Sequence, residues 1–410
     1  MTDLTPEKFP WMRDKAMTAL FKAFPKDSLR FVGGCVRNAL WGEAVTDTDL
    51  AVALKPNEVI SALKSAGIRY IETGVAHGTV TAIIQGKPYE ITSLRQDIET
   101  DGRHAVVTFT EDWAEDAQRR DLTFNTLYAN QDGRVFDPTG QGLEDLKARR
   151  LQFVGEAGAR VKEDYLRILR FFRFLAWYGG DSKVDAASLK ACRENRSGIK
   201  ELSAERVWSE IKKLLLARNP SRALHIMLTN DILEFVLPEA NNVDGVDRLL
   251  KLETRENLDP DPLLRLMAMS AREPLQMALL CKRLKMSGAE TKRLRNWAED
   301  SEALSLDLSE RDRKAVLYRA GKQTVLDRTL LRAAGESDPI KSAHWMSFAN
   351  LASDWERPEF PLSGKDLKAA GVETGPRMGK ALQALEALWI RSGFTAEKDK
   401  LLTALKLLGK

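Results

Sequence analysis

Two carboxylates stand one residue apart in the stretch "FVGGCVRNALWGEAVTDTDLAVAL", Phe31 to Leu54. Asp47 and Asp49 open an apolar, strand-like segment, and alternate residues of a strand point to the same face. Like charges held side by side raise each other's pKa unless a cation lies between them. Mg2+ relieves this repulsion and keeps coordination positions open for phosphate oxygens. The pair therefore predicts a metal site, although an isolated DxD is more commonly a surface turn.

The same stretch also predicts an anion site. Gly33 and Gly34 end an apolar run and begin a helix, where a backbone without side chains brings its N–H groups close to a ligand. Arg37 lies one turn into that helix and can reach the same anion. A Gly-Gly turn alone is usually structural. Beside a carboxylate pair it predicts a phosphate cradle next to a platform for two metal ions, which is the arrangement of a nucleotidyl transfer site.

Glu90 is a candidate third carboxylate. It lies in the strand-like run Pro88 to Leu94, and there it is placed to deprotonate an attacking hydroxyl. An exposed charge on a hairpin explains the residue equally well. The metal prediction therefore rests on Asp47 and Asp49.

Composition predicts an ordinary soluble protein with more than one domain. The chain has 410 residues, of which 43% are hydrophobic and 30% charged, and its formal net charge is +4. The three cysteines are far apart, and the four histidines form no metal-binding spacing, so a disulfide framework and a zinc site are not predicted. No apolar run approaches the length that spans a membrane, and no export signal is recognised at the N-terminus. These features predict a cytoplasmic protein.

The chain divides by pattern into a mixed α/β part and a helical part. Four runs rich in Val, Ile and Thr read as strands: Leu29 to Val32, Thr48 to Leu54, Thr79 to Gln85 and Pro88 to Leu94. A turn is expected at Gly86, Lys87 and Pro88, and the polar segment from Gln96 to Thr110 is expected to be a mobile loop. Helical periodicity dominates after Gly140. We therefore predict a catalytic head at 1–140, a helical recognition and RNA-binding region at 141–252, and a helical body and tail at 253–410.

Three segments, in this order, resemble the signature elements of one family. They are "GGCVRNALWGEAVTDTDL", "RRDLTFNTLY" from Arg119, and "EDYLRILRFFRF" from Glu163, and the weaker "ERVWSEIKKLL" from Glu205 follows them. They are similar to motifs of the polymerase-beta-like nucleotidyltransferases, specifically the class II group of tRNA CCA-adding enzymes and bacterial poly(A) polymerases. The match covers about residues 29 to 216. It implies an α+β fold with a nucleotidyltransferase head built on a small mixed sheet, followed by an elongated all-helical body and tail.

The resemblance also implies roles for particular residues. Asp47 and Asp49 would hold two Mg2+ ions and, with Glu90, form the catalytic group. The residues expected to bind the nucleotide are Gly33, Gly34, Arg37, Arg120, Asn125, Asp164, Arg167, Arg170 and Arg173.

The third segment is the most informative of the three. Outside this context its Asp164, Arg167, Arg170 and Arg173 would read as a charged stripe on a salt-bridged surface helix. In the family, the Asp and the first Arg act as an amino-acid template for the incoming base. A carboxylate accepts from the exocyclic amino group of C or A, and a guanidinium donates to their ring acceptors, whereas U and G would leave groups unpaired. The two later arginines are then left for the phosphates.

The second segment adds a basic pair and two polar residues. Arg119 and Arg120 would otherwise read as a solvated basic pair. Asp121 is expected to cap the following helix while Asn125 faces the sugar.

The function predicted from this resemblance is addition of C, C and A to the 3′ end of tRNA. CTP and ATP are the substrates, tRNA is the partner, and neither DNA nor a membrane is expected. A poly(A) polymerase, or a partial enzyme that adds only CC or only A, remains an alternative because such relatives share the catalytic core. A more remote alternative is an inactive tRNA-binding protein. That alternative predicts damage to the DxD or EDxxR elements, and both are intact.

Overall fold

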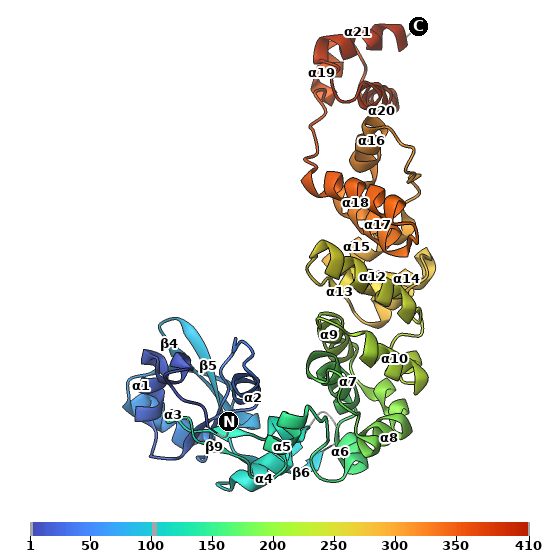
Figure 1. The fold of residues 1–410 in the computed structure, drawn as a ribbon. Coiled ribbons are helices and arrows are strands. Elements are labelled where there is room, and N and C mark those ends of the chain that lie inside the picture. Colours follow the sequence, from blue (N-terminus) through green and yellow to red (C-terminus); the bar gives the residue numbers. More distant parts are fainter. Residues whose placement is uncertain (1–2, 101–104, 409–410) are drawn as a thin grey trace. The chain divides into compact units, whose positions relative to one another are not determined.

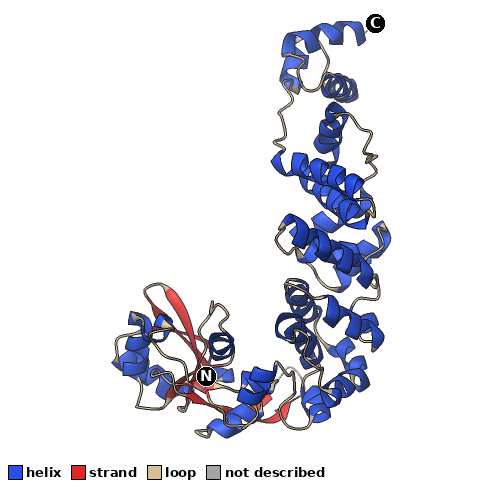
Figure 2. Cartoon of the chain, viewed as in Figure 1, coloured by secondary structure: helices blue, strands red, loops and turns tan. Residues whose placement is uncertain are grey.

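The computed structural model describes residues 3–100 and 105–408. The chain folds into two units, Met1–Val236 and Leu237–Lys410 (Figure 1). The first unit contains all the strands that are described, as Figure 2 shows, and also all the residues predicted to do chemistry.

A seven-stranded mixed sheet forms the base of the first unit. Its order is β3-β4-β5-β2-β1-β8-β9, with β2 and β5 parallel and the other neighbours antiparallel. The strands are β1 (Leu29–Val32), β2 (Leu50–Val52), β3 (Arg69–Gly74), β4 (Thr79–Ile84), β5 (Lys87–Ser93), β8 (Tyr128–Ala129) and β9 (Val135–Phe136). The two central strands, β1 and β2, are almost entirely buried, which fixes the backbone on either side of them.

Three helices accompany the strands that carry the first motif. α1 (Lys15–Ala23) contacts α3 (Pro56–Ser65), which also packs on β3, β4 and β5. α2 (Gly34–Trp41) follows β1 directly and ends at Gly42, whose φ of 78° suits a residue without a side chain. The end of β1 and the start of α2 are therefore held by the sheet on one side and by a helix cap on the other.

The predicted strands are confirmed in place, but three local expectations are wrong. β2 begins at Leu50, so Asp47 and Asp49 lie in the irregular segment before it, and strand alternation does not place their side chains. The hairpin turns at Gln85 and Gly86, with φ of 53° and 78°, because two positive φ values match the twist of the flanking strands. Lys87 and Pro88, expected in the turn, already belong to β5.

The segment expected to be a mobile loop is also different. It contains β6 (Arg95–Thr100) and β7 (Ala105–Phe109), which pair as an antiparallel two-stranded sheet. Residues 101–104 of that segment lie outside the described residues. The two strands pair through their backbones, with a register shift between Asp97 and Glu99. The polar sequence of this segment does not have the alternating apolar pattern that would have predicted a strand.

The rest of the first unit is helical. It comprises α4 (Trp113–Gln118), the short 3-10 helix η3 (Thr123–Asn125), α5 (Gly142–Ala148), α6 (Ala157–Glu163), α7 (Leu166–Tyr178), α8 (Ala186–Glu194), α9 (Ala204–Leu215), α10 (Ser221–Thr229) and α11 (Leu233–Val236). α7 packs against α9 and buries Leu169 and Phe172. These apolar side chains anchor α7 in the core of the first unit, while its arginines are less buried.

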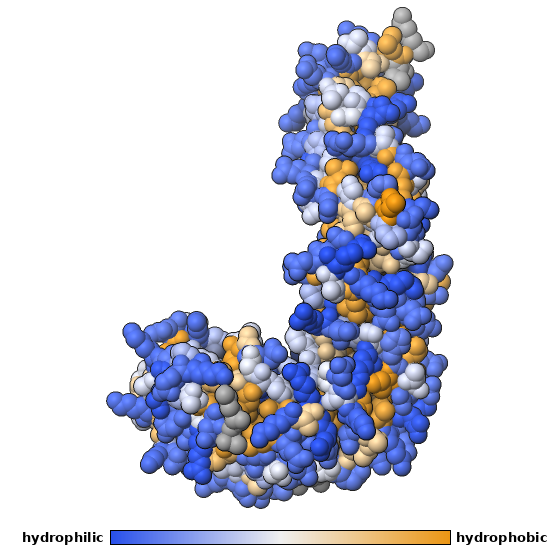
Figure 3. Space-filling view, viewed as in Figure 1, coloured by the Kyte–Doolittle hydropathy of each residue, from blue (hydrophilic) through white to orange (hydrophobic). Residues whose placement is uncertain are grey.

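The second unit contains only helices and connecting segments among its described residues. They run from α12 (Val243–Glu256) and α13 (Pro262–Met269) through α14 (Pro274–Arg283), α15 (Gly288–Glu299), α16 (Glu310–Ala320), α17 (Lys322–Gly335), α18 (Pro339–Asp354), α19 (Gly364–Ala369) and α20 (Pro376–Arg391) to α21 (Lys398–Leu408). On the face shown in Figure 3, hydrophilic side chains cover most of the surface of each unit. No helix among the described residues combines the length and apolar character needed to cross a bilayer.

Candidate active site

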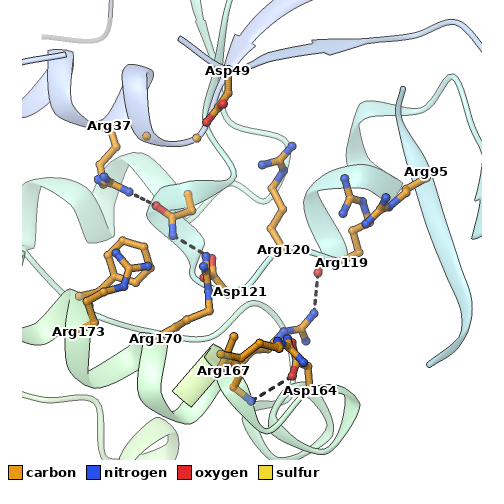
Figure 4. Close-up of a pocket in the computed structure, with 16 residues that line it drawn as sticks. Arg37, Asp49, Arg95, Arg119, Arg120, Asp121, Asp164, Arg167, Arg170 and Arg173 are labelled. Carbon is orange, nitrogen blue, oxygen red and sulfur yellow. Dashed lines mark hydrogen bonds and ion pairs between the residues drawn. The ribbon is translucent and has the colours of Figure 1, made fainter. Parts of the chain in front are cut away.

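One pocket of the first unit collects the residues predicted to bind a nucleotide. Its volume is about 570 Å3, and 16 residues line it (Figure 4). All the predicted nucleotide-binding residues are among them: Gly33, Gly34, Arg37, Arg120, Asn125, Asp164, Arg167, Arg170 and Arg173. Asp49 also lines this pocket, which we call the nucleotide pocket. Segments more than 100 residues apart in sequence therefore meet here, while the role of each residue stays a prediction.

The lining of this pocket is strongly cationic. Eight arginines and three aspartates contribute to it. In Figure 4, the side chains of Arg37, Arg120, Arg170 and Arg173 surround a space with Asp49 at one end and Asp164 at the other. Such an excess of guanidinium groups suits a polyphosphate, whose oxygens accept charge-assisted hydrogen bonds.

The glycine turn lies at the Asp49 end of the pocket. Gly33 has φ of 68° and ψ of −118°, a conformation that L side chains rarely adopt. Its amide donates to the carbonyl of Leu127 at 3.2 Å, and the amide of Val32 donates to the carbonyl of Asp49 at 3.0 Å. A Cβ at Gly33 would lie 3.7 Å from Nη1 of Arg120. Backbone hydrogen bonds therefore fix the turn against Asp49 and Leu127, and the Arg120 side chain lies close to it.

A chain of hydrogen bonds joins α2 to α7 across the pocket. Nη1 of Arg37 donates to Oδ1 of Asn125 at 2.6 Å, and Nδ2 of Asn125 donates to Oδ1 of Asp121 at 2.9 Å. The other carboxylate oxygen of Asp121 accepts two bonds from Arg170 at 2.8 and 2.5 Å. The expected helix cap is wrong, because η3 begins after Leu122 and has no side-chain cap. Asp121 is instead the partner that holds Arg170.

The ionised state of Asp121 follows from these contacts. Burial alone would raise the pKa of this carboxyl, but the Arg170 guanidinium and the hydrogen bonds from Asn125 and the Leu122 amide hold the pKa well below its usual range. Burial lowers the pKa of Arg37, which is 6% exposed. The network therefore keeps a fixed negative charge behind the cationic wall.

A second network, missed by the sequence reasoning, centres on Asp116 of α4. Its Oδ2 accepts from Nη2 of Arg120 at 2.9 Å and from the hydroxyl of Tyr128 at 2.6 Å. Its Oδ1 accepts from Nε of Arg119 at 2.9 Å. Burial would raise the pKa of Asp116, which is 1% exposed, but the two guanidinium groups and Tyr128 lower it to about 2. One carboxylate therefore fixes both arginines of the second motif.

Replacing Asp116 by Asn is expected to destabilise the protein by about 3 kcal/mol, because two partly buried guanidinium groups lose their counter-charge. Weaker positioning of Arg120 should also raise the KM for the predicted substrates, CTP and ATP, by about tenfold. The depressed pKa gives stability that is present above about pH 4 and is lost as the pH falls towards 2. Denaturant unfolding of wild type and variant at pH 7 and near pH 3 measures this effect. The difference between their free energies of unfolding should be smaller at pH 3 than at pH 7.

Glu115→Gln, one residue away on α4, is the matched control. It should leave both the unfolding midpoint and the nucleotide KM near wild-type values. If the difference in free energy of unfolding between wild type and Asp116→Asn is the same at pH 7 and pH 3, Asp116 does not stabilise the protein through its ionised carboxylate.

The predicted base-reading pair lies where α6 meets α7. Asp164 precedes α7 and is not part of its stripe, and its Oδ1 accepts from the Leu166 amide at 3.1 Å. Its Oδ2 pairs with Arg206 of α9 at 2.7 Å. Nη2 of Arg167 donates to the carbonyl of Arg119 at 2.9 Å. Both side chains are thus held by neighbouring elements at the end of the pocket opposite Asp49 (Figure 4).

The last arginine of the third motif is also held from α9. Nε of Arg173 donates to Oε2 of Glu210 at 2.6 Å. Arg206 and Glu210 both belong to "ERVWSEIKKLL", the helical motif that had been given no role. The motif marks this helix in the sequence, but its pattern does not indicate which charged residues Arg206 and Glu210 pair with.

The three predicted catalytic carboxylates line a neighbouring pocket of about 670 Å3, which shares Asp49 with the nucleotide pocket. Asp47 and Glu90 line only this second pocket. Loss of surrounding water raises the pKa of Asp49, and the nearby charges of Glu90 and Asp47 raise it further. Hard oxygen donors that repel one another fit a divalent cation such as Mg2+.

Comparison with protein-family models matches most of the chain. Residues 29–152 match the poly A polymerase head domain. Residues 183–243 match the RNA and SrmB-binding site of polymerase A, and residues 263–405 match tRNA nucleotidyltransferase domain 2.

Similar sequences and structures agree with these matches. The chain is 34% identical to the mitochondrial CCA tRNA nucleotidyltransferase 1 of Homo sapiens, over 98% of this chain and 92% of that protein. It is 30% identical to a CCA-adding enzyme of Pediococcus pentosaceus, over 93% and 94%. The crystal structure of the Bacillus stearothermophilus CCA-adding enzyme in complex with CTP is similar with a TM-score of 0.67, 26% identity and 93% coverage of each chain.

Proposed function

This chain belongs to the CCA-adding tRNA nucleotidyltransferases, and on that basis we propose that it completes the 3′ end of tRNA with C, C and A. The relatives that carry this name align with nearly its whole length. The observation that carries the proposal is the single pocket that brings all three motifs together beside Asp49. The prediction of an α+β fold with a nucleotidyltransferase head and a helical body is confirmed.

The reaction exchanges one phosphorus–oxygen bond for another. The terminal 3′ hydroxyl oxygen of the tRNA bonds to the α-phosphorus of CTP or ATP, and the bond from that phosphorus to the bridging oxygen breaks. Pyrophosphate leaves, and Glu90 is the proposed acceptor of the hydroxyl proton. Arg37, Arg120, Arg170 and Arg173 bind the triphosphate in this proposal, because they supply the cationic wall.

Asp47 and Asp49 are the proposed ligands of two Mg2+ ions. When bound, such ions would compensate charge on the reacting oxygens. The support for this assignment is the set of carboxylate donors around one pocket, together with the pKa of Asp49, which burial and then the charges of Glu90 and Asp47 raise.

Asp164 and Arg167 are the proposed readers of the incoming base. Their carboxylate and guanidinium match the exocyclic amino group and the ring acceptor that C and A share. Asn125 and the Gly33-Gly34 turn lie along the same pocket and complete the proposed nucleotide contacts. Cytoplasmic location stays a prediction, and the human relative carries a mitochondrial name.

The decisive experiment supplies tRNA ending before CCA, at its first C and at CC, with each of the four nucleotides singly and in pairs. The expected products stop after C, C and A. Long A tracts on unrelated RNA would favour a poly(A) polymerase. Addition of only CC or only A would favour a partial enzyme, and binding without any incorporation would favour an inactive tRNA-binding protein.

A further inference from the structure

The pocket of about 670 Å3 shares only Asp49 with the nucleotide pocket, and none of its other lining residues is among those proposed to bind the nucleotide. Three segments form it: the N-terminal region around Trp11, the irregular segment 45–49, and the start of β5 at Lys87–Glu90. We call it the acceptor pocket. It lies wholly in the first unit and meets the nucleotide pocket at Asp49.

The two pockets differ sharply in charge. Eight arginines line the nucleotide pocket, whereas Lys87 is the single cationic side chain among the residues that line the acceptor pocket. Four carboxylates line it as well: Asp14, Asp47, Asp49 and Glu90. A triphosphate therefore favours the first pocket, and the second suits a group that carries hydroxyls.

The geometry of phosphoryl transfer assigns one side of Asp49 to each reactant. The attacking oxygen and the leaving oxygen lie on opposite sides of the phosphorus that is transferred. Because the arginines attract the pyrophosphate, the attacking hydroxyl must approach from the side away from them. The acceptor pocket adjoins Asp49 and also contains Asp47 and the proposed base Glu90.

Aromatic side chains give the acceptor pocket flat apolar surfaces. The Trp11 ring packs edge-on against Phe31, with centroids 4.9 Å apart, and its indole N–H has no hydrogen-bond partner among the described residues. Tyr89 is half-buried and also lines this pocket. Rings of this kind stack on the exposed bases of single-stranded RNA.

We propose that the acceptor pocket binds the 3′-terminal ribonucleoside of the RNA whose hydroxyl is extended. Tyr89 and Trp11 lie against its base, and Lys87, exposed at the start of β5, neutralises the phosphate that precedes it. The proposal rests on the proposed function, since it assigns the second substrate of the same reaction to a place in the fold.

The test separates RNA binding from nucleotide binding. Tyr89→Ala and Lys87→Ala are each expected to raise the KM for tRNA ending in CC by about tenfold at saturating ATP. The Kd of each variant for CTP and ATP without tRNA should stay within about twofold of wild type, because neither residue lines the nucleotide pocket. Tyr89→Phe should behave as wild type, since stacking needs only the ring.

The sheet offers matched controls. Tyr70 on β3 pairs with Ala82, which in turn pairs with Tyr89, so the two tyrosines share a row of the sheet, but Tyr70 does not line the acceptor pocket. Tyr70→Ala and Lys64→Ala on α3 should leave the KM for tRNA unchanged. Circular dichroism and the nucleotide Kd establish that each variant is folded.

A direct readout uses tRNA whose terminal nucleotide is 4-thiouridine. Light-induced crosslinks to peptides containing Trp11 or Lys87–Glu90 would support the proposal. Wild-type KM for tRNA in both Tyr89→Ala and Lys87→Ala, or crosslinks confined to other peptides, would overturn it. Failure of wild-type protein to add C, C and A would instead overturn the proposed function, so the two failures are distinguishable.

Discussion

Asp49→Asn is expected to reduce nucleotide transfer by at least about 1,000-fold while tRNA binding remains intact. Asn keeps the shape of the side chain but removes the charge that a divalent cation needs. Partial burial and the nearby charge of Glu90 raise the pKa of Asp49, and a bound divalent cation would favour its ionised form. Asp47→Asn should lose activity to a similar extent. Single-turnover incorporation of labelled AMP into tRNA ending in CC measures the loss.

Glu43→Gln is the matched control, because Glu43 is an exposed carboxylate in the same segment before β2. It should retain wild-type activity. Binding of Mn2+, followed by electron paramagnetic resonance, should weaken in both Asp variants and not in this control. Transfer above a tenth of the wild-type rate in Asp49→Asn, or unchanged Mn2+ binding, would contradict the metal-ligand role.

The sequence alone predicted the structure correctly where a single short segment contains both the secondary-structure signal and the residues of the site. β1 has the predicted bounds, Leu29–Val32, because an apolar run that stops at two glycines has few other structures available. Gly33 and Gly34 form the predicted junction between strand and helix for the same reason. The three motifs also meet in one pocket, as their resemblance to a known family implied.

Features that depend on distant partners were not accessible in this way. Asp116 is one of two carboxylates in α4, and only the fold brings the Tyr128 hydroxyl to 2.6 Å from it. Arg206 lies 42 residues from Asp164 in sequence, so their ion pair leaves no local signal. The β6–β7 ladder is held by backbone hydrogen bonds, which do not depend on an apolar side-chain pattern.

The same distinction explains the position of the metal-binding carboxylates. Strand alternation placed Asp47 and Asp49 side by side on one face, but the sheet ends at Leu50 and leaves both in an irregular segment. The backbone bond from the Val32 amide to the Asp49 carbonyl fixes that segment instead. An irregular backbone allows Asp49 to line both pockets, whereas Asp47 lines only the acceptor pocket.

Asp164→Asn is expected to weaken the choice of base more than it slows transfer of the best substrate. A carboxylate only accepts hydrogen bonds, whereas the Asn amide can also donate to the carbonyl of U or G. The ratio of kcat/KM for CTP over UTP, and for ATP over GTP, should fall by about 10- to 100-fold. Arg167→Ala should lower both ratios as well, because the guanidinium is the second half of the proposed template.

The control must separate base reading from a general disturbance of α7. Asp181→Asn lies just beyond the far end of that helix, is exposed and does not line the pocket, so its nucleotide preference should match wild type. Asp164 also pairs with Arg206, and Arg206→Ala tests whether that pair alone sets the preference. We expect Arg206→Ala to raise the nucleotide KM while C and A stay preferred, since the Asp164 carboxylate remains. Unchanged ratios in both Asp164→Asn and Arg167→Ala would refute the template assignment, because removing the only proposed base contacts would then have had no effect on which base is chosen.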